Sequence, residues 1–382
     1  MRVLLEREDV NPDAADEYGR TPLCEAVEKG HEGMARILLE RSDINPNTAD
    51  IYGQAPLSLA AENGHEGVVR ILLERGEVNP DTADEDGQTP LSLAAEKGHE
   101  GVVRILLERG DVNPNTTDEA GQTPLHVAAE EGHEGVVRIL LERGEVNPNT
   151  ADEDGRTPLS SAAKNEHEGV VRILLERSDL NPNTADEDGR TPLSLAALWG
   201  HEGIVRMLLE RNDVNPNAAS DDDQTPLSLA ALLGHEGVER MLLGRTDVNY
   251  NTANVDGQTP LSLAACRGHK GIVKMLLEWN DVNPNTADED GRTPLSWAAG
   301  NGAKEIVGIL LERNDINVDI TDHNGQSAAE WAAQNGYDRI AELLRDQAVS
   351  TPRYAASLQP ADTCPPEPSE SSEPPSKRIR RS

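Results

Sequence analysis

The chain has 382 residues, with 35 Lys and Arg against 69 Asp and Glu, so its formal net charge is −34 at pH 7. Residues 348–382 hold five of the basic and four of the acidic residues, which leaves 30 basic against 65 acidic residues in positions 1–347. Such an acidic surface repels phosphate backbones, which argues against direct nucleic-acid binding by this part of the chain.

Cysteine usage and the first residues indicate an intracellular chain, in the cytoplasm or the nucleus. Cys24, Cys266 and Cys364 are far apart and none belongs to a Cys-x-x-Cys pair, which favours a reducing compartment. The start is too short and too charged for a signal peptide. No apolar run approaches the roughly 20 residues that a membrane span needs.

The phrase Gly-[Arg/Gln]-Thr-Pro-Leu returns every 34 residues and organises residues 21–347 into about ten repeats. A fixed period of this length predicts a stack of helical units. Its Thr position falls at Thr21, Ala55, Thr89, Thr123, Thr157, Thr191, Thr225, Thr259, Thr293 and Ser327.

Residues 87–120 show what one unit contains. Thr89 is a good N-cap and Pro90 suits the first helical position, so a first helix is predicted from here to Gly98. A second helix is predicted from about Glu100, with a wide apolar face and an end at Arg109. The rest is Asn-Pro, Asp and Gly turn chemistry, which predicts an extended loop.

These motifs resemble the ankyrin repeat: Thr-Pro-Leu, Ala-Ala, Gly-His, Val-Val-x-[Ile/Met]-Leu-Leu and Asp-Val-Asn occur about ten times. The tetratricopeptide repeat has the matching length of about 34 residues but another Trp/Gly/Tyr pattern. The near-identical units also resemble the long ankyrin arrays of filamentous fungi. The resemblance implies an all-α, ankyrin-type solenoid with β-turn finger loops, and non-catalytic protein recognition on its concave face and fingers.

Both ends depart from the repeat. Residues 1–20 are expected to be a truncated N-terminal half-repeat, because the segment from Val3 aligns with a second helix and the first helix is missing. Residues 348–382 are rich in Pro, Ser and Glu and are expected to be a disordered tail. Its basic end resembles a nuclear-import signal. That signal would consist of Lys377, Arg378, Arg380 and Arg381.

Some units break the pattern internally. Glu166 replaces a helix-ending Gly, and Asp223 replaces a loop Gly. Glu239 occupies an apolar site, and Gly244 is expected inside a second helix, where Gly costs about 1 kcal/mol. We therefore expect the unit that begins at Thr225 to be the least stable.

No metal or cofactor site is predicted. The periodic histidines, His31 to His269, are expected to open the second helices, because repeats about 8–10 Å apart place successive rings too far apart to share an ion. The Asp-Glu-Asp-Gly runs look like part of a calcium loop but lack its full ligand pattern, so turns are expected. A row of acidic fingertips facing a basic partner remains an alternative use. No catalytic motif appears, so no enzyme is expected.

The residues before the helix-ending Gly change character along the array. They are polar in the first four repeats, as in Glu28-Lys29 and Glu130-Glu131, and largely apolar later. An exposed apolar patch often marks an interaction site, although local repacking explains the change equally well. The predicted partner-binding residues are Leu198, Trp199, Leu232, Leu233, Cys266, Arg267 and, as an addition, Trp279, which replaces a recurring Arg. Trp297 and Trp331 replace a Leu at a site interpreted as semi-buried, and they are expected to belong to the core.

Three functions remain open at this stage. The chain is a scaffold or adaptor for an unidentified protein partner. Because the surface of the array is acidic, a basic protein is one option for that partner. Alternatively, the chain is a nuclear regulator imported through its tail, or the C-terminal fragment of a larger protein whose N-terminal domain carries the effector activity.

Overall fold

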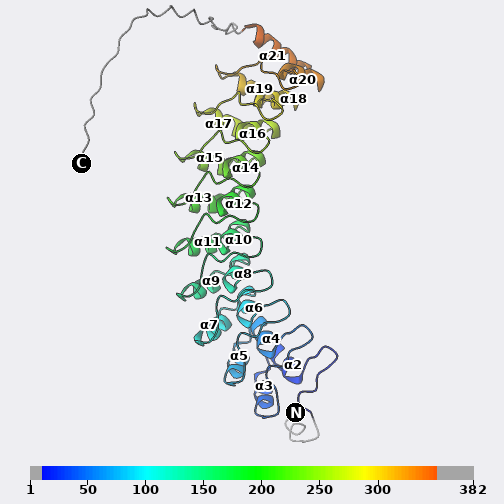
Figure 1. Cartoon of the computed structure of the whole chain (residues 1–382), viewed down its shortest axis with the longest axis vertical. Coiled ribbons are helices and arrows are strands. Elements are labelled where there is room, and N and C mark those ends of the chain that lie inside the picture. Colours follow the sequence, from blue (N-terminus) through cyan, green and yellow to red (C-terminus); the bar gives the residue numbers. More distant parts are fainter. Residues whose placement is uncertain (1–10, 351–382) are drawn as a thin grey trace, which may run out of the picture.

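The structure is a computed structural model that describes residues 11–350. In this range the chain forms twenty helices, arranged as ten consecutive pairs, and one isolated β-bridge between Thr321 and Ser327. Figure 1 shows an elongated stack in which the first and second helices of the pairs form two neighbouring columns. The predicted all-α ankyrin-type solenoid is confirmed.

The first helices of the pairs begin at the residue after the capping Thr, Ala or Ser. They are α2 (Pro22–Glu28), α4 (Pro56–Glu62), α6 (Pro90–Glu96), α8 (Pro124–Glu130), α10 (Pro158–Lys164), α12 (Pro192–Trp199), α14 (Pro226–Leu233), α16 (Pro260–Arg267), α18 (Pro294–Gly300) and α20 (Ala328–Gln334).

The second helices begin directly after the recurring His or its substitute. They are α3 (Glu32–Leu39), α5 (Glu66–Leu73), α7 (Glu100–Glu108), α9 (Glu134–Leu141), α11 (Glu168–Leu175), α13 (Glu202–Leu209), α15 (Glu236–Leu243), α17 (Lys270–Leu277), α19 (Lys304–Leu311) and α21 (Asp338–Ser350).

The helix signals in the sequence act as expected. The Thr89 hydroxyl accepts the Ser92 N–H at 3.2 Å, which satisfies one of the free donors at the start of α6. Gly98 follows the helix with φ +76°, a left-handed conformation that suits Gly. A Cβ at Gly98 would also lie 2.7 Å from Nδ1 of His133 in the next repeat. This Gly therefore serves both the turn and the stacking of repeats.

The apolar faces of successive pairs form one continuous core. In the repeat of α6 and α7, Leu91, Ala94, Val102 and Leu106 are fully buried. Each first helix packs on the first helices before and after it, and the second helices from α3 to α19 do the same. Burial of one Leu side chain contributes about 1.5–3 kcal/mol, so the stack is held mainly by contacts between neighbouring repeats.

The recurring His joins each repeat to the one before it. Nε2 of His99 lies 2.9 Å from the carbonyl oxygen of Glu62, at the end of the preceding first helix. The same contact occurs at His65, His133, His167, His201, His235 and His269. The structural role predicted for these residues is confirmed, and the bond satisfies a carbonyl that the helix leaves free.

The loop segment Asn-Pro-Asn-Thr, residues 147–150 in one repeat, supplies a second link between repeats. The Asn149 amide donates to the Asp179 carbonyl at 2.8 Å, and its Oδ1 accepts the Asn181 N–H at 2.7 Å. Both partners belong to the next repeat. Equivalent asparagine contacts recur in other repeats and form an asparagine ladder along the stack.

The finger loops are turns, as expected. Asp186 Oδ1 accepts the N–H groups of Asp188 and Arg190 at 3.1 and 2.8 Å, which closes the loop around a buried carboxylate. One backbone bond, from the Glu187 N–H to the Asp154 carbonyl at 2.9 Å, joins this finger to the preceding one. Backbone N–H groups thus occupy Oδ1 of Asp186.

Two expectations about particular residues are wrong. Gly244 lies at the C-cap of α15 with φ −71°, where Glu stands in most repeats, so the cost of a Gly inside a helix does not apply. Trp297 and Trp331 are half-buried, as expected for their site, but they do not belong to the apolar core. Their indole N–H groups donate to the buried residues Asp288 and Asp322.

At the ends, α21 continues to Ser350, past the expected boundary of the array at residue 347. The first half of the predicted half-repeat, residues 1–10, and most of the predicted tail, residues 351–382, lie outside the described residues.

Glu239 introduces a carboxyl group into the core between repeats. It stands on α15 where the neighbouring second helices carry Val205 and Val273, and it is fully buried. Neither carboxyl oxygen has a hydrogen-bond partner in the structure. Burial raises the pKa of Glu239 well above its usual range, because the charged form loses its hydration.

We predict that Glu239→Val stabilises the array and that its advantage grows with pH. The folded protein holds a proton on Glu239 that the unfolded chain releases near pH 4.3, so the wild type loses stability as pH rises above that value. At pH 7 we expect a gain of about 1–3 kcal/mol. Urea unfolding between pH 4 and pH 8 measures it, with exposed Glu236→Gln as the control; a gain independent of pH would contradict the account.

Candidate functional site

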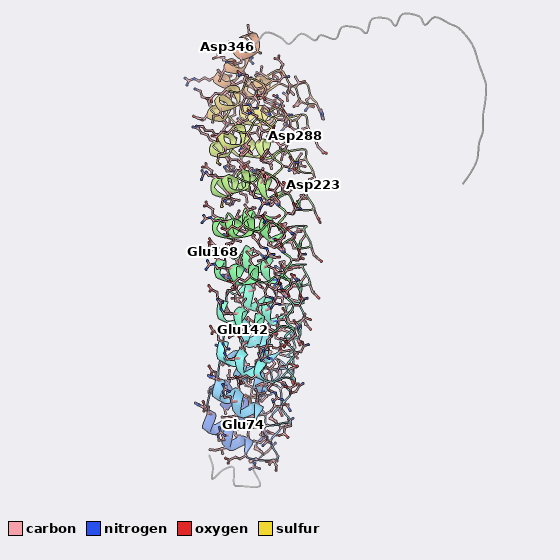
Figure 2. The ribbon with its side chains drawn as sticks, turned by 90° about the vertical axis from the view of Figure 1, so that its left-hand side faces the viewer. Glu74, Glu142, Glu168, Asp223, Asp288 and Asp346 are labelled. Carbon is pink, nitrogen blue, oxygen red and sulfur yellow. The ribbon has the colours of Figure 1, made fainter. Side chains whose placement is uncertain are left out.

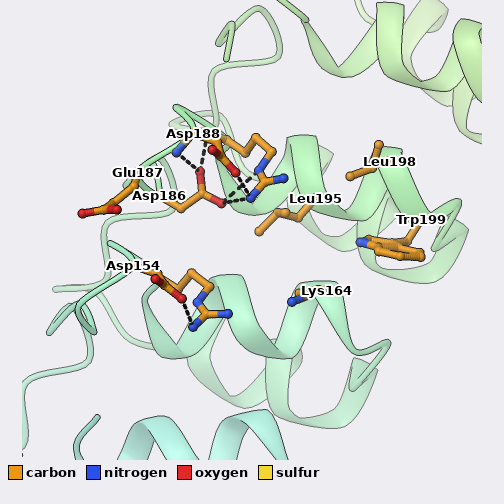
Figure 3. Close-up of a pocket in the computed structure, with 10 residues that line it drawn as sticks. Asp154, Lys164, Asp186, Glu187, Asp188, Leu195, Leu198 and Trp199 are labelled. Atoms are coloured by element: carbon orange, nitrogen blue, oxygen red, sulfur yellow. Dashed lines mark hydrogen bonds and ion pairs between the residues drawn. The ribbon is translucent and has the colours of Figure 1, made fainter. Parts of the chain in front are cut away.

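A groove of about 340 Å³ lies where the ends of α10 and α12 face the finger loops. The helices contribute Lys164, Leu195, Leu198 and Trp199, and Figure 3 shows these side chains opposite the fingers. The fingers contribute Asp154, Arg156, Asp186, Glu187, Asp188 and Arg190. The structure thus places Leu198 and Trp199 in a groove with acidic and basic walls.

The apolar residues at the rim of this groove are exposed. The Trp199 side chain is 55% exposed and Leu233, one repeat later, is 46% exposed, whereas Leu198 and Leu232 are half-buried. Trp199, Leu233 and Arg267 each form the last residue of a first helix that ends on a left-handed Gly. We call Leu198, Trp199, Leu232 and Leu233 the rim patch.

The same groove occurs near the N-terminus with a polar rim. There, Glu62 and Asn63 take the places of Leu198 and Trp199, and Arg20, Tyr52 and Gln54 line the loop side. This groove measures about 420 Å³. The concave shape is therefore common to the repeats, and the rim patch changes only its chemistry.

Losing the rim carboxylate also changes the pairing inside the groove. In early repeats the residue before the capping Thr reaches the end of the first helix, as in Arg20 to Glu28 at 2.9 Å and Gln122 to Glu130 at 2.9 Å. In the repeat of Arg190, Leu198 stands at the position of that Glu. Arg190 instead pairs with two carboxylates of its own finger, Asp186 at 3.0 Å and Asp188. Arg156 pairs with Asp152 and Asp154 in the same way.

Cys266 and Arg267 continue the rim one repeat further. Cys266 is half-buried, and Asn301 of the next repeat donates to its carbonyl at 2.8 Å. Burial raises the pKa of the Cys266 thiol, while Arg267 and Arg292 act in the opposite direction. Arg267 is exposed. The rim thus changes from apolar to cationic along the stack.

Trp279 belongs to a different surface. It follows α17, at the opposite end of its antiparallel helix pair from the rim, and its ring centroid lies 5.2 Å from that of Tyr250. In other repeats Arg stands here and bonds backward, as Arg245 does to the Leu209 carbonyl at 2.8 Å. The structure therefore does not bring Trp279 to the groove.

One buried polar cluster, with residue types that hydrolases use, could not be foreseen from the sequence. His126 Nε2 lies 2.8 Å from the Ser161 hydroxyl and 3.6 Å from Asp152 Oδ2. The same ring nitrogen, Nε2, faces both Ser161 and Asp152, so the three groups do not form a base–nucleophile relay. All three side chains are also buried, so a substrate at the surface could not reach them. Burial lowers the pKa of His126, against the opposing effect of Asp152. This cluster packs two repeats together.

Acidic side chains extend over the length of the array. Figure 2 shows labelled carboxylates from Glu74 to Asp346 at successive levels of the stack. Among residues 11–350 no group of three potential ligands could hold a metal ion, and no helix is long and apolar enough to cross a membrane. The predicted import residues Lys377, Arg378, Arg380 and Arg381 lie outside the described residues.

Comparisons with known proteins agree with the geometry. The sequence matches the family model for ankyrin repeats (three copies) in overlapping segments: residues 1–83, 42–118, 76–152, 110–186, 144–219, 212–288 and 279–353. No curated protein sequence matches. Among solved structures, the ankyrin repeat domain of Bcl-3, a member of the IkappaB protein family, is similar at 29% identity with a TM-score of 0.53. That match covers 60% of this chain and all of that one.

We predict that His235→Ala weakens the stack beneath the rim patch. The substitution removes the bond from His235 Nε2 to the Leu198 carbonyl, 3.1 Å away, which holds the end of α12. The expected cost is about 0.5–1.5 kcal/mol. Urea unfolding measures it, and amide hydrogen exchange at residues 197–200 should rise. The matched variant His133→Ala should leave exchange at these residues unchanged; an equal rise there would contradict the local role.

Proposed function

Since this chain belongs to the ankyrin-repeat family, whose repeats bind protein partners, we propose that it is a non-catalytic scaffold or adaptor that holds a protein in its concave groove. The observation that carries this proposal is the exposure of Trp199 and Leu233, at 55% and 46%, beside a groove with charged walls. Trp and Arg are the residues most enriched among those that dominate binding energy.

The groove supports recognition by contacts of two kinds. An apolar side chain of the partner would cover Trp199 and Leu233, which removes their surface from water. Basic side chains of the partner would meet the exposed carboxylates of Glu187 and Asp188 on the finger. Because the fingers and helices are already joined by hydrogen bonds, binding would order few additional residues.

The earlier repeats provide an internal contrast for this proposal. Their groove has the same walls but carries Glu and Lys, Asn or Glu at the rim, which stay hydrated. A partner that contacts the rim patch would therefore bind at the repeats of α12 and α14 in preference to those of α4 to α8. Nuclear delivery through Lys377, Arg378, Arg380 and Arg381, and an effector domain in a longer protein, stay predictions.

We predict that Trp199→Glu combined with Leu233→Glu strongly weakens partner binding. Glu131 already occupies this position in an earlier repeat, so the change is compatible with the fold. Loss of a central Trp contact of this kind costs about 2 kcal/mol or more, roughly 30-fold in affinity. Affinity capture from the native cell with mass spectrometry, wild type beside variant, measures it.

The matched control is Lys97→Ala combined with Glu131→Ala, which alters the equivalent rim positions of earlier repeats. A partner kept by the wild type and this control but lost by the Trp199/Leu233 variant would support the proposal. Equal recovery with all three proteins would show that the rim patch is not the binding site.

A further inference from the structure

Arg292 differs from the other arginines that precede a first helix. Its guanidinium carbon lies 4.8 Å from the ring centroid of Trp297 and 4.2 Å from that of Trp331. Nε is buried without a hydrogen-bond partner. Across residues 11–350 we find no ion pair or side-chain hydrogen bond of Arg292. In contrast, Arg20, Arg156 and Arg190 all form ion pairs.

The neighbouring residues explain why Arg292 is left without a carboxylate. Gly300 stands where Glu28 receives Arg20, so the helix end offers no acceptor side chain. Asp288 stands where Asp186 pairs with Arg190, but its Oδ2 accepts the indole N–H of Trp297 at 2.8 Å. The two substitutions, to Gly and to Trp, thus remove both usual partners of this arginine.

The second Trp, Trp331, also contacts the Arg292 guanidinium. Trp331 donates its indole N–H to Asp322 at 3.0 Å, so its ring is fixed beside the guanidinium. Asp322 is buried, which raises its pKa, but backbone donors, Trp331 and Arg292 outweigh burial and hold that pKa below the usual value. A cation over two fixed rings is already partly desolvated and restricted, which favours binding of an anion to its remaining N–H groups.

Arg267 adds a second unpaired cation near the same place. It is exposed at the end of α16, and among the described residues its guanidinium has no ion pair. Arg267 and Arg292 both act electrostatically on the Cys266 thiol, so both lie in its neighbourhood. The fingers that precede α16 and α18 carry the exposed acidic residues Asp256, Glu289 and Asp290.

We propose that Arg292, fixed by Trp297 and Trp331 and assisted by Arg267, binds a side-chain oxyanion of a peptide segment in the groove. The oxyanion is a carboxylate or a phosphate, and the acidic fingers favour segments in which basic residues flank it. This inference rests on the proposed function, because it names chemistry that a partner in the groove would carry. It concerns repeats beyond the rim patch and is tested without the native partner.

The test uses three labelled synthetic peptides, Arg-Gly-X-Gly-Arg with X as Glu, phosphoserine or Gln, added to the full chain. Fluorescence anisotropy gives the affinities. We expect the Glu or the phosphoserine peptide to bind at least about tenfold more tightly than the Gln peptide, as a charge-assisted bidentate contact requires. Whichever of the two is preferred identifies the source of the oxyanion. No preference over Gln would overturn the proposal.

The variants introduce residues that other repeats of this chain carry at the same position, so they are compatible with the fold. Arg292→Gln introduces the residue found at Gln258, and Trp297→Leu introduces the residue found at Leu263. Both should remove the preference, the second because Asp288 becomes free to pair with Arg292. The control Arg190→Gln removes an arginine that is already paired and should retain it. Equal loss in the control would show general electrostatic attraction and overturn the proposal.

The four tryptophans supply a direct readout. In the ¹⁵N-labelled protein, the preferred peptide should shift the indole N–H signals of Trp297 and Trp331 and leave those of Trp199 and Trp279 in place. Shifts at Trp199 alone would locate binding at the rim patch and overturn the Arg292 site while leaving the proposed function intact.

Discussion

Contact between neighbouring repeats is the constraint on which the rest of the structure depends. A pair of helices with seven to nine residues each cannot bury its apolar faces alone, so each pair relies on the next. The His-to-carbonyl bond, the asparagine ladder and the finger-to-finger bond repeat at the same interval and fix the register of that contact. Residues that take part in these links are therefore constrained in every repeat. Glu239 is the described exception in the core, because it places an unpartnered carboxyl group where other second helices carry Val.

Freedom to vary remains at the groove, and changes there alter pairing as well as polarity. Where Leu198 replaces the rim Glu, apolar surface is exposed, and Arg190 forms its ion pairs with carboxylates of its own finger. Replacing a buried Leu by Trp297 occupies Asp288 and leaves Arg292 without a carboxylate. One backbone framework thus presents a polar groove near the N-terminus, an apolar rim in the middle and an arginine–tryptophan cluster beyond it. Under the proposed function, specific recognition would rest on these differences, because the stack itself is nearly uniform.

Much of this organisation could be predicted from the sequence because its causes are local. The Thr-Pro start, the Gly end and the Asp turn each act within a few residues, and the period places them along the stack. The groove position of Leu198 and Trp199 followed from the resemblance and from their place before the helix-ending Gly. The pairing of Arg292 could not be predicted, because it depends on Trp331 in the next repeat and on competition for Asp288. The assignment of Trp297 to the core and the position of Gly244 were misjudged for a related reason: helix ends and side-chain direction depend on the neighbouring repeat.

The account's central claim is that partner recognition is concentrated where the groove departs from the common repeat. Hydrogen–deuterium exchange of the full chain, free and bound to its captured partner, tests this claim most directly. The account predicts that protection on binding concentrates between residues 152 and 300, at the rim patch and its facing fingers, with little change in the repeats of α2 to α8. Protection spread evenly over the array, or concentrated in those early repeats, would contradict it.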